Sequence, residues 1–359
     1  MLKRLLFILS IACCCYLPAV SQHFVYDLDA KIFFDNREYH NPLDSSQTIL
    51  GTRLSPEIGV MFRDSMRGVH RLMGGVQYVQ PMNGSFHDAV LMPTIYYHYK
   101  TPHFNFLFGS FPVKYMRKAL PGVLLDDSLS YFSPNLRGAL MRYAGKLGYI
   151  EAACDWYSMK TKEHPYEAFR LILNGELQYK WLYGGGYLTS GHYTQPMVNH
   201  SKIRVCDNMV LNPYLGVNLS SITPLDTLQI QCGYLYTMSR DRYQQDLMTG
   251  YGVMLDFQMA KTFLKRHAVG LKNTFFYSDN FMPMYYRFGV NLYRGHPFYR
   301  AKWYNRTELS ADIVKFDFVD LRFSWVFHYV LGWKVGHQQM VTLDFHLDEL
   351  PKVKKHNSK

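Results

Sequence analysis

The sequence predicts an all-β protein, a transmembrane antiparallel up-and-down β-barrel of about sixteen strands, with fourteen as the alternative count. Apolar and polar residues alternate in runs of about ten residues, most clearly in 228–238, and this period is that of a strand with one apolar face. The chain offers no uncharged apolar stretch beyond its N-terminus that is long enough for a spanning helix. Aromatic residues make up 16% of the chain, which suits the girdles at the two edges of a membrane barrel.

Each predicted strand is a run of this alternation that ends at turn residues or a polar segment. In 24–34, for example, aromatic and aliphatic side chains occupy one face while Asp27, Asp29 and Lys31 occupy the other. The expected strands are 24–34, 52–62, 70–79, 90–100, 103–111, 138–144, 149–157, 168–179, 181–189, 207–219, 227–238, 250–260, 267–277, 304–316, 319–330 and 338–347.

The connections between these strands alternate in length. Short turns such as Thr101–Pro102 lie on one side, and the other side carries longer loops: 35–49, 80–89, 112–137, 158–167, 190–206, 239–249, 278–303 and 331–337. Short periplasmic turns and long outer loops are typical of outer-membrane barrels. The alternation in 338–347 is similar to the terminal strand that the barrel-assembly machinery recognises, although no aromatic residue ends this chain.

The mature chain as a whole resembles the porin-like outer-membrane β-barrels of Gram-negative bacteria, and Gln22 is similar to the first residue of exported Bacteroidota proteins. Residues 1–21 are expected to be a signal peptide, because Lys3 and Arg4 precede a short apolar stretch and a small-x-small pattern ends it. An uncleaved anchor and lipoprotein processing at Cys13, Cys14 or Cys15 are the alternatives. Residues 22–347 are assigned to the barrel, and 348–359 to a polar, lysine-rich periplasmic tail.

The connection 112–137 is the candidate for a segment that narrows the lumen. In general porins the loop at this position folds into the pore, and the apolar residues of this one need a place to pack. It carries both signs of charge, which would filter solutes by charge: Lys114, Arg117, Lys118, Asp126 and Asp127. An outward lid or a surface loop with an ordinary mixed charge pattern is the alternative.

A second set of charged residues falls at polar-face positions and is expected to line the lumen, because Arg or Lys at mid-depth on the lipid face would cost ~2–4 kcal/mol. The set is Lys31, Arg53, Glu57, Arg142, Glu151, Asp155, Arg170, Glu176, Asp256, Lys272 and Arg322. Acidic and basic residues are nearly balanced in it. An occluded lumen that is held by salt bridges would therefore show the same pattern.

These observations favour a porin-like channel of the cell outer membrane for passive passage of small hydrophilic solutes, sugars among them. A non-conducting structural or interaction component of a surface or secretion assembly is the main alternative, and an enzyme that acts on lipid or glycan is a more distant one. No enzyme activity, cofactor or metal is expected, because His192, His296 and the other histidines lie in no recognisable hydrolase motif or ligand spacing. A net charge of +11 often indicates nucleic-acid binding, but an exported barrel rarely meets nucleic acid. The excess basic residues gather in loops, where outer-membrane lipid and lipopolysaccharide are the expected partners and an ordinary solvated surface is the alternative. The other expected partners are the barrel-assembly machinery and the solute, with a homo-oligomer left open.

Overall fold

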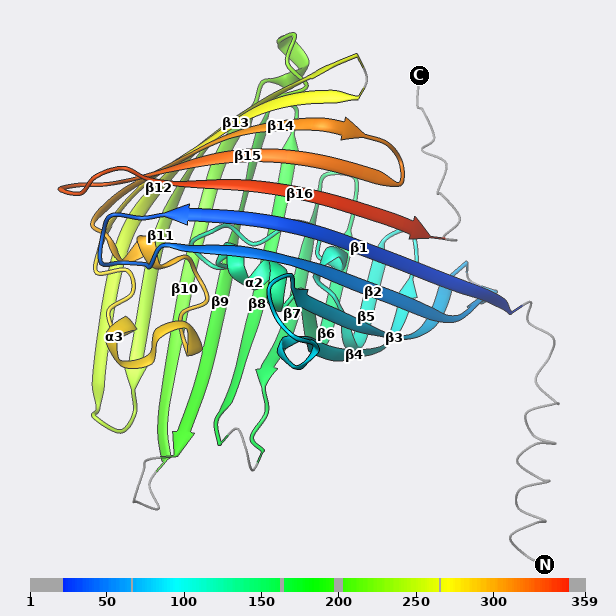
Figure 1. The fold of residues 1–359 in the computed structure, drawn as a ribbon, viewed down its shortest axis with the longest axis horizontal. Coiled ribbons are helices and arrows are strands. Elements are labelled where there is room, and N and C mark those ends of the chain that lie inside the picture. The colour runs from blue at the N-terminus through cyan, green and yellow to red at the C-terminus, as the bar shows by residue number, and fades with distance from the viewer. Residues whose placement is uncertain (1–21, 66, 162–164, 197–202, 265, 349–359) are drawn as a thin grey trace, which may run out of the picture.

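The computed structural model describes residues 22–348 except 66, 162–164, 197–202 and 265, and it is a closed barrel of sixteen antiparallel strands (Figure 1). The fold class and the count of sixteen are thereby confirmed. The predicted signal peptide and the predicted tail beyond Asp348 lie outside the described residues. In chain order the strands are β1 (His23–Glu38), β2 (Gln47–Arg63), β3 (Val69–Pro81), β4 (Val90–Lys100), β5 (Phe104–Pro112), β6 (Asn135–Ala144), β7 (Gly148–Ser158), β8 (Glu167–Tyr179), β9 (Leu182–Pro196), β10 (Ile203–Asn218), β11 (Thr227–Asp241), β12 (Asp246–Phe263), β13 (His267–Asp279), β14 (Trp303–Lys315), β15 (Val319–Val330) and β16 (Gly336–Asp348).

Neighbouring strands in sequence are neighbours in the sheet, and β1 closes the ring on β16 with Asp27 opposite Asp348. Most strands are longer than the alternation predicts. The largest difference is in the expected loop 190–206, where β9 runs on to Pro196 and β10 begins at Ile203. The added residues of β9, from Ser190 to Pro196, are mostly polar, so this end of the strand has no apolar face that alternation could show.

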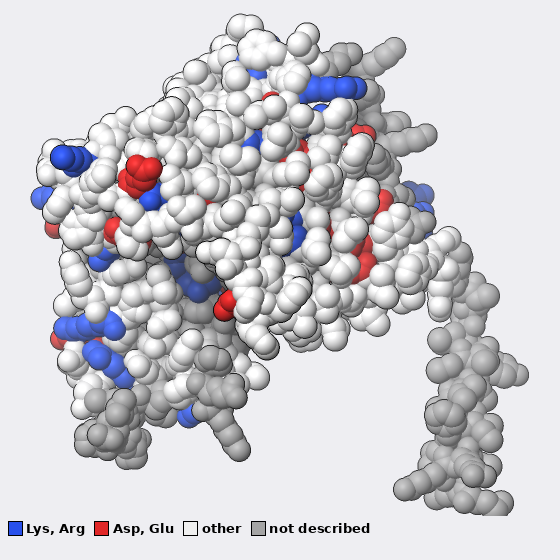
Figure 2. Space-filling view, viewed as in Figure 1, with Lys and Arg blue, Asp and Glu red and all other residues white. Residues whose placement is uncertain are grey.

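The two faces of the wall follow the predicted alternation. On β1 the side chain of Phe24 is 62% exposed on the outside, whereas Asp27 and Asp35 on the inside are 2% and 0% exposed. Uncharged side chains cover most of the strand surface in Figure 2. No helix in the described part of the chain is long and apolar enough to cross a membrane.

Two long outer connections fold back between the strands and fill much of the interior. The first, residues 113–134, contains the short helix α2 (Asp127–Phe132), and the second, residues 280–302, contains α3 (Tyr285–Phe288). Their apolar side chains form one buried cluster with inward residues of the wall, including Leu124 at 4% exposure and Phe298 at 0%. The core of this protein therefore lies inside the barrel, whereas the outer face of the wall is apolar and exposed.

Candidate functional site

The segment 113–134 crosses the interior and is tied to strands on several sides. Lys114 Nζ lies 2.8 Å from Asp27 Oδ2 and also pairs with Asp29 on β1, and Lys118 pairs with Glu176 on β8. The backbone N–H of Arg117 donates to Glu151 on β7 at 3.1 Å. The segment thus bridges β1 to β7 and β8 across the lumen.

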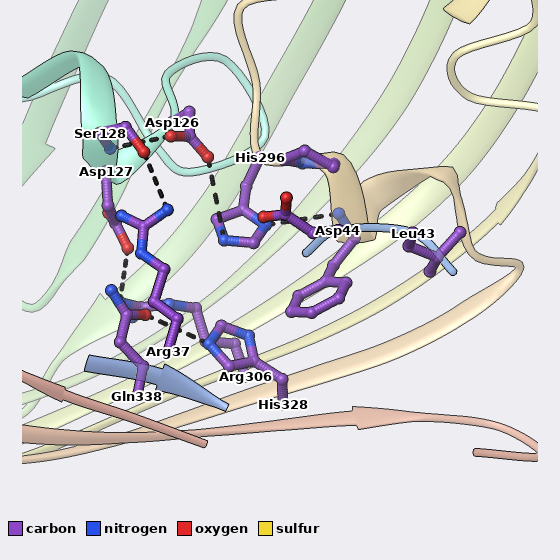
Figure 3. A network of polar contacts seen from close by, with 12 residues as sticks. Arg37, Leu43, Asp44, Asp126, Asp127, Ser128, His296, Arg306, His328 and Gln338 are labelled. Carbon is purple, nitrogen blue, oxygen red and sulfur yellow. Dashed lines mark hydrogen bonds and ion pairs between the residues drawn. The ribbon is translucent and has the colours of Figure 1, made fainter. Parts of the chain in front are cut away.

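The end of this segment enters a polar network near the outer end of the barrel (Figure 3). Ser128 Oγ accepts a 2.8 Å hydrogen bond from Arg37, and Asp127 lies 3.5 Å from Arg306. Burial raises the pKa of Asp127, but the nearby positive groups, Arg306 first and then His296, Arg37 and His328, together outweigh burial and the pKa falls to about 2.

The same network joins the two inward connections. Asp126 Oδ2 lies 3.8 Å from His296 Nε2, and the backbone N–H of Asp126 donates to the carbonyl of Arg294 at 2.7 Å. The His296 N–H in turn donates to the carbonyl of Gly122 at 2.9 Å. Residues 280–302 therefore hold residues 113–134 in place from the side that faces the outer end of the barrel.

Inward side chains of the wall engage either this segment or each other. Arg53 donates to the Ser130 carbonyl at 3.0 Å, and Arg170 donates to the Leu124 carbonyl at 2.7 Å and lies 3.9 Å from Asp155. The other predicted lumen residues face inward as follows: Lys31 pairs with Asp344, Glu57 accepts from Tyr96, Arg142 pairs with Glu151, Glu176 pairs with Lys118, Asp256 accepts from Thr274, Lys272 borders a cavity, and Arg322 pairs with Asp312.

These pairs use most of the charges that were expected to select solutes. A polar cavity of about 300 Å³ remains between residues 118–122 and strands β9–β13, bordered by Gln231, Asp256 and Lys272. Among the described residues, one group has metal-ligating geometry, with donor atoms of Asp27, Asp29 and His346 within 4.8 Å of one another. Lys114 Nζ already pairs with both carboxylates of that group.

A different kind of site lies on the outside of the wall, where β8, β9 and β10 reach their outer ends. His192 on β9 is directly opposite Asp207 on β10, and His192 Nδ1 lies 2.7 Å from Asp207 Oδ1. Arg242 Nε donates to the other carboxylate oxygen of Asp207 at 2.7 Å. The side chains of His192 and Asp207 are 22% and 28% exposed, so solvent and lipid reach both.

Aromatic rings extend this site along the wall. Phe169 on β8 lies opposite His192, and their ring centroids are 4.9 Å apart. Trp156 on β7 stacks on Phe169 at 4.8 Å. Aromatic rings of this kind mark the edge of the hydrocarbon layer in membrane barrels. Trp181, 51% exposed in the short turn before β9, marks the opposite edge.

The depth of His192 follows from that turn. A membrane strand needs about 9–11 residues to cross the hydrocarbon layer. His192 comes 11 residues after Trp181 on an unbroken strand. Because β9 starts at the periplasmic turn, His192 and Asp207 lie at the outer leaflet's interface with water.

Other histidines next to carboxylates differ from His192 in their contacts. His70, at the periplasmic end, uses Nδ1 for Tyr97 and Nε2 for Asp64, and His337 uses both nitrogens for Gln339 and Glu38. Of the two ring nitrogens of His192, only Nδ1 has a hydrogen-bond partner among the described residues. An imidazole that is oriented through Nδ1 and open at Nε2 has the geometry of a general base.

Sequence reasoning placed His192 in a loop and did not connect it with Asp207. One signal could have found the pair. Asp207 stands at an apolar-face position of its strand, two residues before Met209 and four before Leu211, where a carboxylate needs a partner. The partner itself depends on the register between β9 and β10, which the alternation does not show.

The fold is similar to that of three solved structures. The loop L8 deletion mutant of OmpT from Vibrio cholerae is 9% identical, with a TM-score of 0.54 over 91% of this chain and 100% of that one. OccK9 (OpdG) of Pseudomonas aeruginosa is 9% identical, with a TM-score of 0.52 over 90% and 98%. The channel DcaP of Acinetobacter baumannii is 10% identical, with a TM-score of 0.50 over 91% and 97%. At these identities the likeness shows the fold alone.

The expected outer-membrane location is confirmed by this fold and by the family match. No curated protein matches the sequence.

The family model that does match is described as lipid A 3'-O-deacylase-type and covers residues 17–341. The expectation that the chain is not an enzyme is therefore wrong, since this family is named for an enzyme activity. That expectation rested on the lack of a recognisable hydrolase motif in the sequence, and the lack of a motif does not exclude an enzyme. The chain belongs to the lipid A 3'-O-deacylase-type family of outer-membrane proteins.

Proposed function

We propose that the protein is an ester hydrolase of the outer membrane that removes an acyl chain from an acylated, phosphorylated glycolipid of the outer leaflet. The observation that carries this proposal is the His192–Asp207 pair on the lipid-facing wall at the outer interface. The acyl esters of such a lipid lie at this depth and outside the barrel. The name of the family supports the same reaction class.

His192 acts as the general base in the proposed reaction. Asp207 holds Nδ1–H and orients the ring, so that Nε2 takes a proton from a water molecule as the water oxygen attacks the ester carbonyl. The tetrahedral intermediate then releases its alcohol oxygen, which takes the proton back from Nε2. The C–O bond of the ester is broken, and the products are a free fatty acid and the deacylated glycolipid.

Water, rather than Ser190, is the nucleophile in this proposal. Ser190 lies on the same face of β9 as His192 but two residues away, which places their side chains about 7 Å apart. This separation is too long for a direct hydrogen bond. A Ser190→Ala variant should therefore keep most of its activity.

Two arginines next to the pair suit a phosphorylated substrate. Arg242 already donates to Asp207, and Arg240, exposed on β11, is the residue opposite Asp207 in the sheet. Guanidinium groups bind phosphate oxygens through paired hydrogen bonds. Arg240 is thus placed to hold a phosphate of the lipid headgroup while the ester lies at His192.

The test is deacylation of purified lipopolysaccharide by the purified protein in detergent, followed by mass spectrometry of the lipid portion. We expect His192→Gln to lower the rate about 10²–10⁴-fold, the usual contribution of a general base. His70→Gln is the matched control, because it alters a His–Asp pair at the opposite membrane face. A wild-type rate in His192→Gln, or no fatty acid release by the wild type, would refute the proposal.

Passage of small hydrophilic solutes is a second candidate function, favoured by the polar cavity of about 300 Å³ in the lumen. Residues 113–134 and 280–302 narrow the path beyond that cavity. Single-protein conductance in planar bilayers tests this candidate directly, and a barrel that opens no steps of current would exclude it.

A further inference from the structure

A second feature of the outer wall is an apolar groove on the inner-leaflet half of β7–β10. It has a volume of about 980 Å³, at the upper end of the range of about 300–1,000 Å³ for ligand sites. Its walls are aliphatic side chains that face the membrane: Ile150, Leu173, Leu177, Leu188 and Leu211.

The groove is a dent in the sheet rather than a gap between loops. Gly175, Gly186 and Pro213 are direct neighbours across β8, β9 and β10, so one row of the wall has almost no side chains on its outer face. Backbone atoms crowd this row, since a Cβ on Gly175 would lie 2.8 Å from the Tyr149 carbonyl oxygen. The dent is therefore a fixed part of the fold.

Positive charge gathers at the periplasmic mouth of the groove. Lys146, in the turn between β6 and β7, borders the groove, and Lys180 lies in the turn between β8 and β9. The turn between β6 and β7 contacts the end of β8, because the N–H of Gln178, two residues before Lys180, donates to the Leu147 carbonyl at 2.7 Å. Neither turn contains Asp or Glu, and both lysines are exposed.

We propose that this groove is a specific site for an anionic glycerophospholipid of the inner leaflet. One acyl chain lies in the dent over Gly175 and Gly186, and Lys146 and Lys180 bind the phosphate at the mouth. Apolar walls alone give no preference inside a membrane, because surrounding lipid tails are equally apolar. The two lysines supply the selectivity for a negative headgroup. This inference does not depend on the proposed hydrolase activity, whose site lies at the other leaflet.

The experiment is native mass spectrometry of the detergent-purified full chain with added palmitoyl-oleoyl-phosphatidylglycerol or the matching phosphatidylcholine. We expect the wild type to retain the phosphatidylglycerol preferentially. Each lysine near an anionic lipid contributes about fivefold in binding, so Lys146→Gln with Lys180→Gln should weaken phosphatidylglycerol binding about 30-fold, down to the level of phosphatidylcholine. Arg63→Gln with Arg67→Gln is the matched control, since it removes two exposed charges from the end of β2 and the periplasmic turn that follows it.

A second variant tests the groove itself. Leu211→Trp fills the upper part of the dent without changing charge, and we expect it to lower retention of both lipids. Heat-modifiable migration on gels verifies that each variant is folded. A preference for phosphatidylglycerol that survives the double lysine substitution, or is lost equally in the Arg63/Arg67 control, would overturn the proposal. Unchanged retention in Leu211→Trp would overturn the placement of the chain.

Discussion

Glu151→Gln should destabilise the barrel and release the segment 113–134. Glu151 on β7 is fully buried and accepts three hydrogen bonds, from Arg142 Nη1 at 2.9 Å, from Asn174 Nδ2 at 3.1 Å and from the backbone N–H of Arg117 at 3.1 Å. The substitution keeps the shape of the side chain and removes its charge. Arg142 would then be left in the interior without a counter-charge.

The expected cost follows from burial. Removing one partner of a buried pair costs about 3–5 kcal/mol, because the remaining charge is uncompensated. The Arg142 side chain is 16% exposed, and some solvation remains, so we expect about 3 kcal/mol. Lys31→Gln is the matched control: its pair with Asp344 is 22% and 40% exposed, and such pairs contribute about 0–1 kcal/mol.

The assay is urea unfolding in detergent micelles, followed by tryptophan fluorescence, with limited proteolysis of the folded state as a second measurement. Glu151→Gln should lower the free energy of unfolding by about 3 kcal/mol and expose residues 113–134 to protease. If Glu151→Gln and Lys31→Gln lowered the free energy of unfolding equally, by less than about 1 kcal/mol, buried ion pairs would not be what holds residues 113–134 in the barrel.

Three further predictions concern the outer wall, the contact of the first inward connection with β14, and the contact between the two inward connections. Asp207→Asn should lower deacylation strongly while leaving thermal unfolding nearly unchanged, because Asp207 is partly exposed and acts through His192; full activity would refute its positioning role. The Asp127–Arg306 pair should stabilise the fold above about pH 3.8 and lose this contribution, about 2 kcal/mol at most, as pH falls through about 2, since the pKa of Asp127 is lowered in the folded state. Hydrogen exchange of residues 113–134 between pH 5 and 2 measures this loss. Asp127→Asn should reduce the pH dependence, and the remainder comes from the other carboxylates that hold the segment, such as Asp27 and Asp29. Gly295→Ala would place a Cβ 2.1 Å from the Val123 carbonyl oxygen, so it should separate the two connections and lower the free energy of unfolding by about 1–3 kcal/mol. We expect this separation to raise conductance in planar bilayers. Unchanged conductance would show that this contact does not limit the path.

Much of the architecture follows from local pattern. A strand places successive side chains on opposite faces, so alternation alone assigns Arg53 and Glu151 to the inside and Leu211 and Leu215 to the membrane. Segments without clean alternation were placed less well, and the extension of β9 through His192 to Pro196 is the main example. Polar strands above a membrane have no apolar face to reveal them.

The candidate sites depend on contacts between residues that are distant in sequence. Lys114 was recognised as part of a charged segment, but its pairing with Asp27, 87 residues away, requires the fold of that segment within the closed barrel. The His192–Asp207 pair likewise requires the register of β9 on β10, which follows from the turn and from closure of the whole ring. The sequence by itself determined the barrel, its membrane and the direction of each side chain, because these depend on a period of two residues. The tertiary structure decided which charges neutralise one another and which imidazole remains open to the membrane, because both are properties of distances across strands.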